Sequence, residues 1–209
     1  MIESPILKKT ANQNEEFSAF RKNKKIPTLI ERNVLKALSF YPQLKNAEIS
    51  FVFRRNIRSS VMLAQPVFRT LIKKREKRKY RIYISSMFKL KQSSIPIQQL
   101  PDEVMIGWIG HELGHIMDYE TRSNAGLVVF GISYYLSGTY VKKAEVIADT
   151  FAVNHGLGRH IILTKRFILD HAEIPQSYKN KISRLYLSPD VIMEQVRKLE
   201  EEQTPIEKI

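Results

Sequence analysis

Apolar and polar positions change their period once along the chain, and the change predicts two kinds of structure. After the polar stretch 1–25, which we interpret as a flexible or loosely docked N-terminal extension, apolar residues recur at helical spacing over 27–41. Runs rich in branched and aromatic residues then predict strands, which cover 49–53, 61–64, 67–72 and 80–85. The last two runs alternate well and flank a basic stretch, so the pattern predicts an antiparallel hairpin.

From Pro101 onward the spacing predicts helices. The first covers about 101–120, with acidic residues in the first turn, where they favour the helix dipole. The others are predicted, with breaks at Gly156 and Pro175, over about 141–154, 159–171, 176–186 and 189–202. A small sheet followed by helices indicates an α+β fold. We therefore expect one domain over 26–209, with a small mixed or antiparallel sheet at 48–86, site-bearing helices at 101–156 and C-terminal helices at 159–202.

The composition is typical of a globular protein that folds without disulfides. Of the 209 residues, 43% are hydrophobic and 26% are charged, close to globular averages. The chain contains no cysteine, which excludes disulfides, cysteine nucleophiles and zinc sites built on thiolates. The segment from Met1 to Lys9 lacks the apolar core of a secretory signal, so we expect a cytoplasmic protein.

Residues 111–115 read His-Glu-Leu-Gly-His and carry the strongest chemical signal. Residues four apart lie on the same face of a helix, so His111 and His115 can point at one metal ion. Zinc suits two imidazole ligands, and Glu112 can take a proton from a zinc-bound water. The pattern predicts hydrolysis assisted by one bound Zn²⁺. A peptide bond is the expected substrate. Gly114 is unfavourable in a helix, which indicates that another backbone or a substrate approaches there.

A catalytic zinc site needs a third protein ligand. The extended pattern with a third histidine is absent, because Asp118 and Thr121 stand where its glycine and histidine would be. The next candidates are Glu145 and Asp149, four apart on the predicted helix 141–154 among apolar neighbours. If that helix packs antiparallel to the first, one carboxylate can bind zinc and the other can accept a hydrogen bond from a ligand histidine.

The two motifs, HELGH and Glu145-x-x-Ala148-Asp149, together resemble those of the gluzincin metallopeptidases, particularly the HtpX-like and CAAX-prenyl-protease-like group and its soluble minimal relatives. The resemblance covers about residues 100–160. It implies a zincin-like fold in which His111, His115 and Glu145 bind zinc, Glu112 acts as general base and acid, and Asp149 orients a histidine. It also implies an edge strand that pairs with an extended substrate, for which the segment 80–85 is the candidate.

Several functional questions stay open at this stage. The donor that would stabilise the oxyanion is one of Tyr140, His155, His160 and His171. The expected partner is a peptide or protein substrate. One rival hypothesis is an ImmA/IrrE-like regulatory peptidase, which also carries an H-E-x-x-H helix and a downstream Glu. The other is a binding module that keeps the zinc fold and cleaves nothing.

Two further segments bear on interactions. Residues 126–136 form the most apolar run, which is shorter than the roughly 20 residues needed to span a bilayer. We predict that the run packs over the active site, with an interfacial membrane contact as the alternative. Residues 73–81 are the densest basic cluster in a chain of net charge +13. We interpret them as a solvated hairpin tip that allows peripheral contact with an anionic membrane or an acidic partner, with nucleic acid the weaker candidate.

Overall fold

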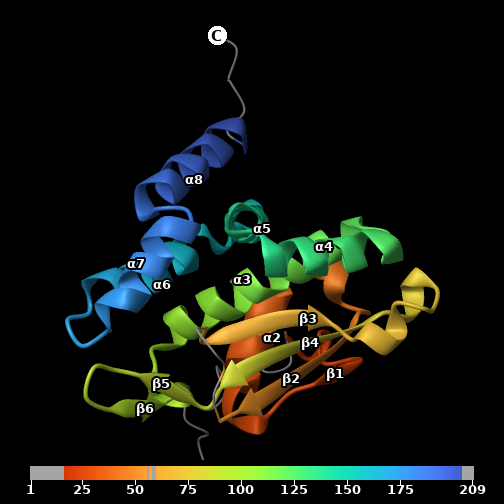
Figure 1. Ribbon diagram of the computed structural model, residues 1–209, viewed down its shortest axis with the longest axis horizontal. Helices are drawn as coiled ribbons and strands as arrows, with labels where there is room; N and C mark the ends of the chain where they lie inside the picture. Colours follow the sequence, from red (N-terminus) through yellow and green to blue (C-terminus); the bar gives the residue numbers. More distant parts are fainter. Residues whose placement is uncertain (1–16, 56, 58–59, 204–209) are drawn as a thin grey trace, which may run out of the picture.

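A mixed four-stranded sheet forms one layer of the structure (Figure 1). The computed structural model describes residues 17–55, 57 and 60–203. In spatial order the strands are β1 (Lys24–Lys25), β2 (Glu48–Arg54), β4 (Lys79–Ser85) and β3 (Met62–Pro66). β1, β2 and β4 are parallel, whereas β3 is antiparallel to β4. The sheet begins inside the stretch 1–25 that we assigned to an extension, of which residues 1–16 lie outside the described residues.

Helices cover the sheet and make up most of the rest of the structure, which confirms the α+β class. Figure 1 shows α3 between the sheet and the later helices. A short second sheet joins β5 (Met87–Lys89) and β6 (Ser94–Pro96). The α-helices of the described residues are α2 (Glu31–Ser39), α3 (Asp102–Thr121), α4 (Asn124–Leu136), α5 (Gly138–Ala152), α6 (Gly158–Asp170), α7 (Gln176–Leu185) and α8 (Pro189–Gln203).

The central helix α3 is buried on all sides. Every residue from Val104 to Ile116 is buried, because the sheet lies on one side of α3 while α2, α5 and α6 pack against its other sides. This burial explains why the helix is apolar all round rather than amphipathic. The HELGH motif therefore lies in the interior of the fold and not on a solvated helix surface.

Two strand predictions are wrong. The segment 67–72 is not a strand: it contains a 3₁₀ turn at Phe68–Thr70, and the apolar side chains of Phe68 and Ile72 are exposed. The antiparallel partner of β4 is instead β3. The segment 80–85 is not an edge strand either, since β4 pairs with β2 on one side and with β3 on the other. In the sheet of the described residues, β3 is the edge strand next to α3.

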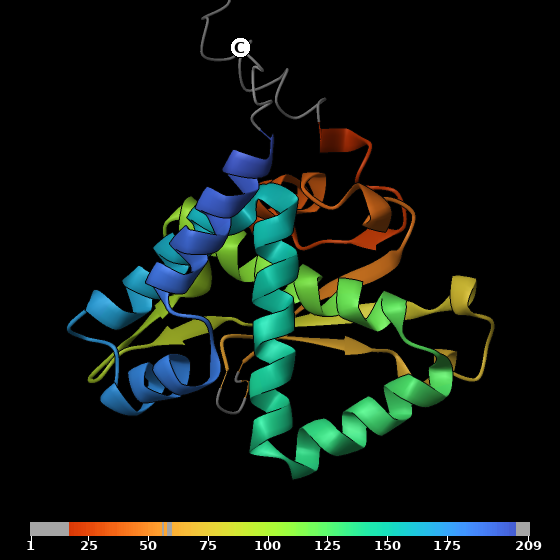
Figure 2. The same ribbon diagram turned by 90° about the horizontal axis from the view of Figure 1, so that it is seen from above.

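The helices α3 and α5 meet at a close backbone contact. Figures 1 and 2 show that α5 crosses α3 rather than lying antiparallel beside it. The antiparallel packing on which the prediction for Glu145 and Asp149 was conditioned is therefore wrong. A Cβ atom on Gly114 would lie 2.4 Å from the backbone oxygen of Ala148. The expectation that a second backbone approaches Gly114 is therefore confirmed. The predicted break at Gly156 also appears, because this residue has φ +84° between α5 and α6.

Candidate metal centre

Three side chains that could bind a metal come together from two helices near the edge strand β3. His111 and His115 come from α3 and Glu145 from α5, all buried, and one ligand atom of each lies within 4.8 Å of the others. Glu145 Oε2 lies 3.0 Å from His111 Nε2 and 3.3 Å from His115 Nε2. The two imidazole rings stand nearly perpendicular, at 87°. Their nitrogens thus face the same carboxylate oxygen.

The spacing of these atoms fits a metal ion. Ligands at zinc–nitrogen and zinc–oxygen bond lengths of about 2.0–2.1 Å, in tetrahedral geometry, are about 3.3 Å apart. The distances of 3.0 and 3.3 Å to Glu145 Oε2 are close to that value. The group His111, His115 and Glu145 could therefore hold a metal ion, and the structure brings together these three residues that the sequence singled out.

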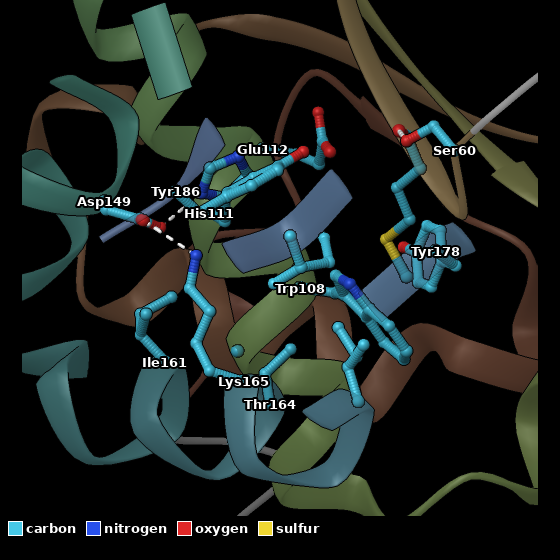
Figure 3. Close-up of a pocket in the computed structure, with 14 residues that line it drawn as sticks. Ser60, Trp108, His111, Glu112, Asp149, Ile161, Thr164, Lys165, Tyr178 and Tyr186 are labelled. Atoms are coloured by element: carbon cyan, nitrogen blue, oxygen red, sulfur yellow. Dashed lines mark hydrogen bonds and ion pairs between the residues drawn. The ribbon is translucent and has the colours of Figure 1, made fainter. Parts of the chain in front are cut away.

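Asp149 lies one turn beyond Glu145 and contacts the other side of the His111 ring. Its Oδ1 is 2.8 Å from His111 Nδ1, which leaves Nε2 facing the cluster. Its Oδ2 accepts hydrogen bonds from Lys165 Nζ at 2.8 Å and from the backbone N–H of Leu187 at 3.2 Å. Figure 3 shows Asp149 between His111 and Lys165. The carboxylate is fully buried, and its three partners fix its position.

Burial and paired charges determine the protonation of this cluster. Burial alone would lower the pKa of His111, but the charges and hydrogen bonds of Asp149 and Glu145 outweigh it and raise that pKa to about 10. Burial would raise the pKa of Glu145, yet the charges of His115 and His111 and hydrogen bonds from both rings hold it well below its usual range. Without a metal, these pKa shifts favour a protonated His111 imidazole between two ionised carboxylates.

Glu112 points toward the edge strand rather than into the ligand cluster. Its Oε2 accepts a hydrogen bond from the backbone N–H of Ala64 on β3, at 2.6 Å. Burial raises the pKa of Glu112, and the charges of His115 and His111 offset only part of that rise. A carboxylate with a raised pKa is better suited to accept and return a proton near neutral pH. The structure thus places the predicted base at the boundary between the histidines and β3.

A cleft of about 550 Å³ lies between β3 and helices α4 and α5 and reaches the metal centre. As predicted, the segment 126–136 packs over this site: it lies in α4, whose Leu127 and Phe130 are buried. Tyr134 of α4 donates a hydrogen bond to Glu145 Oε1 at 2.7 Å. Lys181 and Tyr186 from the α7 region also line the cleft, and the Tyr186 ring is 5.4 Å from the His111 ring.

The four proposed oxyanion donors are not among the described residues that line this cleft. His155 stacks on Tyr41 with ring centroids 4.7 Å apart, and His160 Nε2 lies 2.9 Å from a carboxylate oxygen of Glu103. His171 Nδ1 accepts a hydrogen bond from the backbone of Glu173 at 3.3 Å. Tyr140 accepts a long bond from Arg122 at 3.5 Å.

Five residues at this site were not predicted from the sequence, namely Ala64, Tyr134, Lys165, Lys181 and Tyr186. Tyr134 stood within the apolar run that we expected over the site, but no spacing distinguished it from its neighbours. The other four lie far from the two motifs in sequence and reach the site only through the fold.

Comparisons with protein-family models, with curated proteins and with solved structures find no match for this chain.

Proposed function

We propose that this protein is a zinc-dependent metallopeptidase with a zincin-like fold of the gluzincin type. One observation carries the proposal. The buried cluster of His111, His115 and Glu145 lies next to Glu112, which accepts a hydrogen bond from the backbone of the edge strand β3. The proposal is supported by one cleft that is lined by Glu112, by His115 and Glu145 of this cluster, and by the edge strand β3.

The donor set supports zinc over other divalent ions. Two imidazole nitrogens and one carboxylate oxygen are the ligands of many catalytic zinc sites, which keep the fourth position for water or substrate. When bound, zinc would lower the pKa of a coordinated water and polarise the carbonyl of the scissile bond. Asp149 supports this assignment because a carboxylate on the far nitrogen of a ligand histidine holds its tautomer and orientation.

The remaining steps belong to residues of the chain. Glu112 accepts the proton of the attacking water and passes it to the leaving amine, while Ala64 N–H holds its carboxylate in place. An extended peptide lies along β3, whose outer backbone groups include Met62 C=O and Ala64 N–H and C=O. In the free protein the two carbonyls accept hydrogen bonds from the hydroxyls of Ser60 and Tyr119. Backbone N–H groups of the substrate replace these two donors, while the Ala64 N–H keeps its bond to Glu112.

The test combines metal analysis with a peptide-library cleavage screen. We expect about one zinc per chain, cleavage that chelation abolishes, and cleavage restored by added zinc. Glu112→Gln should retain zinc and lower kcat by about 10²–10⁴-fold, whereas Glu145→Ala should lose zinc. Exposed Glu201→Ala on α8 is the matched control for both. Undiminished zinc in Glu145→Ala would overturn the ligand assignment, and zinc binding without any cleavage would indicate a binding module instead.

A further inference from the structure

Large apolar side chains are exposed along the outer side of α4. Val129, Ile132 and Leu136 have exposed fractions of 60%, 56% and 74%, and their spacing of three and four places them on one face. Val128 and Tyr135 beside them are also exposed, whereas Leu127 and Phe130 on the inner side are buried. The helix is thus apolar all round although only one side is covered, which indicates a second contact surface.

The loop 67–78 extends this surface at the start of α4. Asn124 at the helix start donates a hydrogen bond to the backbone oxygen of Lys73 at 2.8 Å and accepts one from Arg78 at 2.7 Å. Figure 2 shows the loop beside this end of α4. The loop exposes Phe68 and Ile72, at 72% and 87%. Elsewhere in the described residues, exposed large apolar side chains are only Leu29, Val191 and Met193.

Basic side chains border the apolar surface at both ends. The chain carries no charged residue from Ser123 to Val141. The loop beside the start of α4 carries the exposed side chains of Arg69, Lys73, Lys74, Arg75 and Lys77, with Glu76 as its only acid, and beyond the end of α4 Lys142 and Lys143 are exposed. Apolar side chains between lysines and arginines are complementary to an anionic bilayer surface, where acyl chains lie beneath phosphate groups.

We propose that α4 and the loop 67–78 together dock the protein on an anionic membrane surface. α4 lies in the interfacial plane with Val129, Ile132 and Leu136 toward the acyl chains, and the flanking cations contact lipid phosphates. The mode is interfacial and not spanning: no helix of the described residues is long and apolar enough to cross a bilayer. The docking does not depend on metal or on hydrolysis, because Val129 and Ile132 do not line the cleft.

Flotation with lipid vesicles tests the proposal on the full chain. We expect binding to vesicles of phosphatidylcholine mixed with phosphatidylglycerol, weak binding to phosphatidylcholine alone, and a decline with added salt. The variant Val129→Asp/Ile132→Asp should bind at least about tenfold more weakly. Its matched control, Leu29→Asp/Val191→Asp, replaces exposed apolar residues outside α4 and should bind like the unaltered protein.

A second pair of variants tests the cations without touching an apolar residue. Lys73→Gln/Lys74→Gln should bind about twentyfold more weakly, because each lysine near the lipid surface strengthens binding about fivefold. Lys89→Gln/Lys91→Gln removes equal charge from exposed positions at the β5–β6 hairpin, and we expect little change. Thermal melting of each variant checks that the fold is intact, and the exposed lysine variants are expected to fold normally.

The proposal is overturned if the unaltered protein does not bind the anionic vesicles, or if all variants bind them equally. Analytical ultracentrifugation identifies the competing occupant. A dimer that Val129→Asp/Ile132→Asp dissociates, together with no vesicle binding, would assign the outer side of α4 to a second copy of the chain.

Discussion

At the scale of single residues, the charge state of His111 bears on how the proposed metal site would bind an ion. Its pKa of about 10 in the metal-free protein means that its protonated form predominates at neutral pH. A metal ion binds only the neutral imidazole, so it must displace this proton. The two carboxylates that orient the ring thus also hold the proton that opposes metal binding.

We therefore predict that zinc affinity rises about tenfold for each pH unit between about pH 7 and 9, with about one proton released per zinc. Calorimetry in buffers of different ionisation enthalpy measures the released proton. Asp149→Asn should flatten the slope, because the charge of Asp149 raises the pKa of His111 more than that of Glu145 does. Zinc affinity that does not change over this range would contradict a protonated His111.

Lys165 is a second residue whose charge matters. It is 4% exposed and bonds to Asp149, which is fully buried. We predict that Lys165→Met destabilises the fold by about 3–5 kcal/mol, since it leaves Asp149 with a less compensated buried charge. Urea unfolding of the chelated protein measures the change. Lys198→Met, on the exposed surface of α8, is the control and should unfold at nearly the same urea concentration.

Residues close together in sequence were the ones whose placement could be foreseen. His111 and His115 lie four apart on one helix, and Glu145 and Asp149 share another, so helical period alone put each pair on one face. Ala64 and Lys165 reach the same site from β3 and α6. Their positions depend on how segments distant in the sequence pack together, and a local sequence pattern does not predict that packing.

At the scale of elements, the contact between α3 and α5 sets the geometry of the ligands. Gly114 lets the backbone of Ala148 approach α3, and Ala148 lies between Glu145 and Asp149 on α5. A side chain at position 114 would push α5 away and carry both carboxylates with it.

We predict that Gly114→Ala lowers the free energy of unfolding by about 1–3 kcal/mol or more, because the added Cβ would lie against a backbone atom. It should also lower zinc affinity. Gly131→Ala is the matched control, since a Cβ there has no described atom within 4 Å, and the better helix propensity of alanine should stabilise α4. Equal zinc affinity in Gly114→Ala and Gly131→Ala would contradict the role given to this contact.

The helices were predicted better than the strands. Helix starts and ends carry local signals such as Pro101, Gly156 and Pro175. The predicted helices agree within a few residues with α2, α3 and α5 to α8, whereas α4 was not among the helices predicted. Strand pairing depends on partners elsewhere in the chain. Alternation at 67–72 resembled a half-buried strand, yet Phe68 and Ile72 are exposed, and β4 proved to be interior because β3 covers its other side.

At the scale of the whole molecule, the size of the hydrophobic core leads us to expect a fold that does not depend on a bound metal. The hydrophobic core joins α2, the sheet and α3 and continues to α6 and α8. A chain of this size buries enough apolar surface to fold without a metal.

We predict that chelated protein keeps its far-ultraviolet circular dichroism spectrum at 25 °C. Zinc should raise the unfolding temperature with a free-energy gain of about 4 kcal/mol at a thousandfold excess over Kd. Calorimetric scans across a zinc titration measure this gain. Loss of helical signal on chelation would show that the ion is needed for folding.

The hydrogen bonds donated by the backbone amides of Ala64 and Leu187 limit how far the chain can be shortened. The two motifs occupy only 111–149, yet Glu112, the proposed proton acceptor, is anchored by the backbone amide of Ala64, and Asp149, which bonds to His111, is anchored by that of Leu187. The shortest recombinant fragment that preserves the centre must therefore reach from β3 past the end of α7. A fragment confined to the motif helices would carry all three proposed metal ligands and still lack both of the amides that hold Glu112 and Asp149.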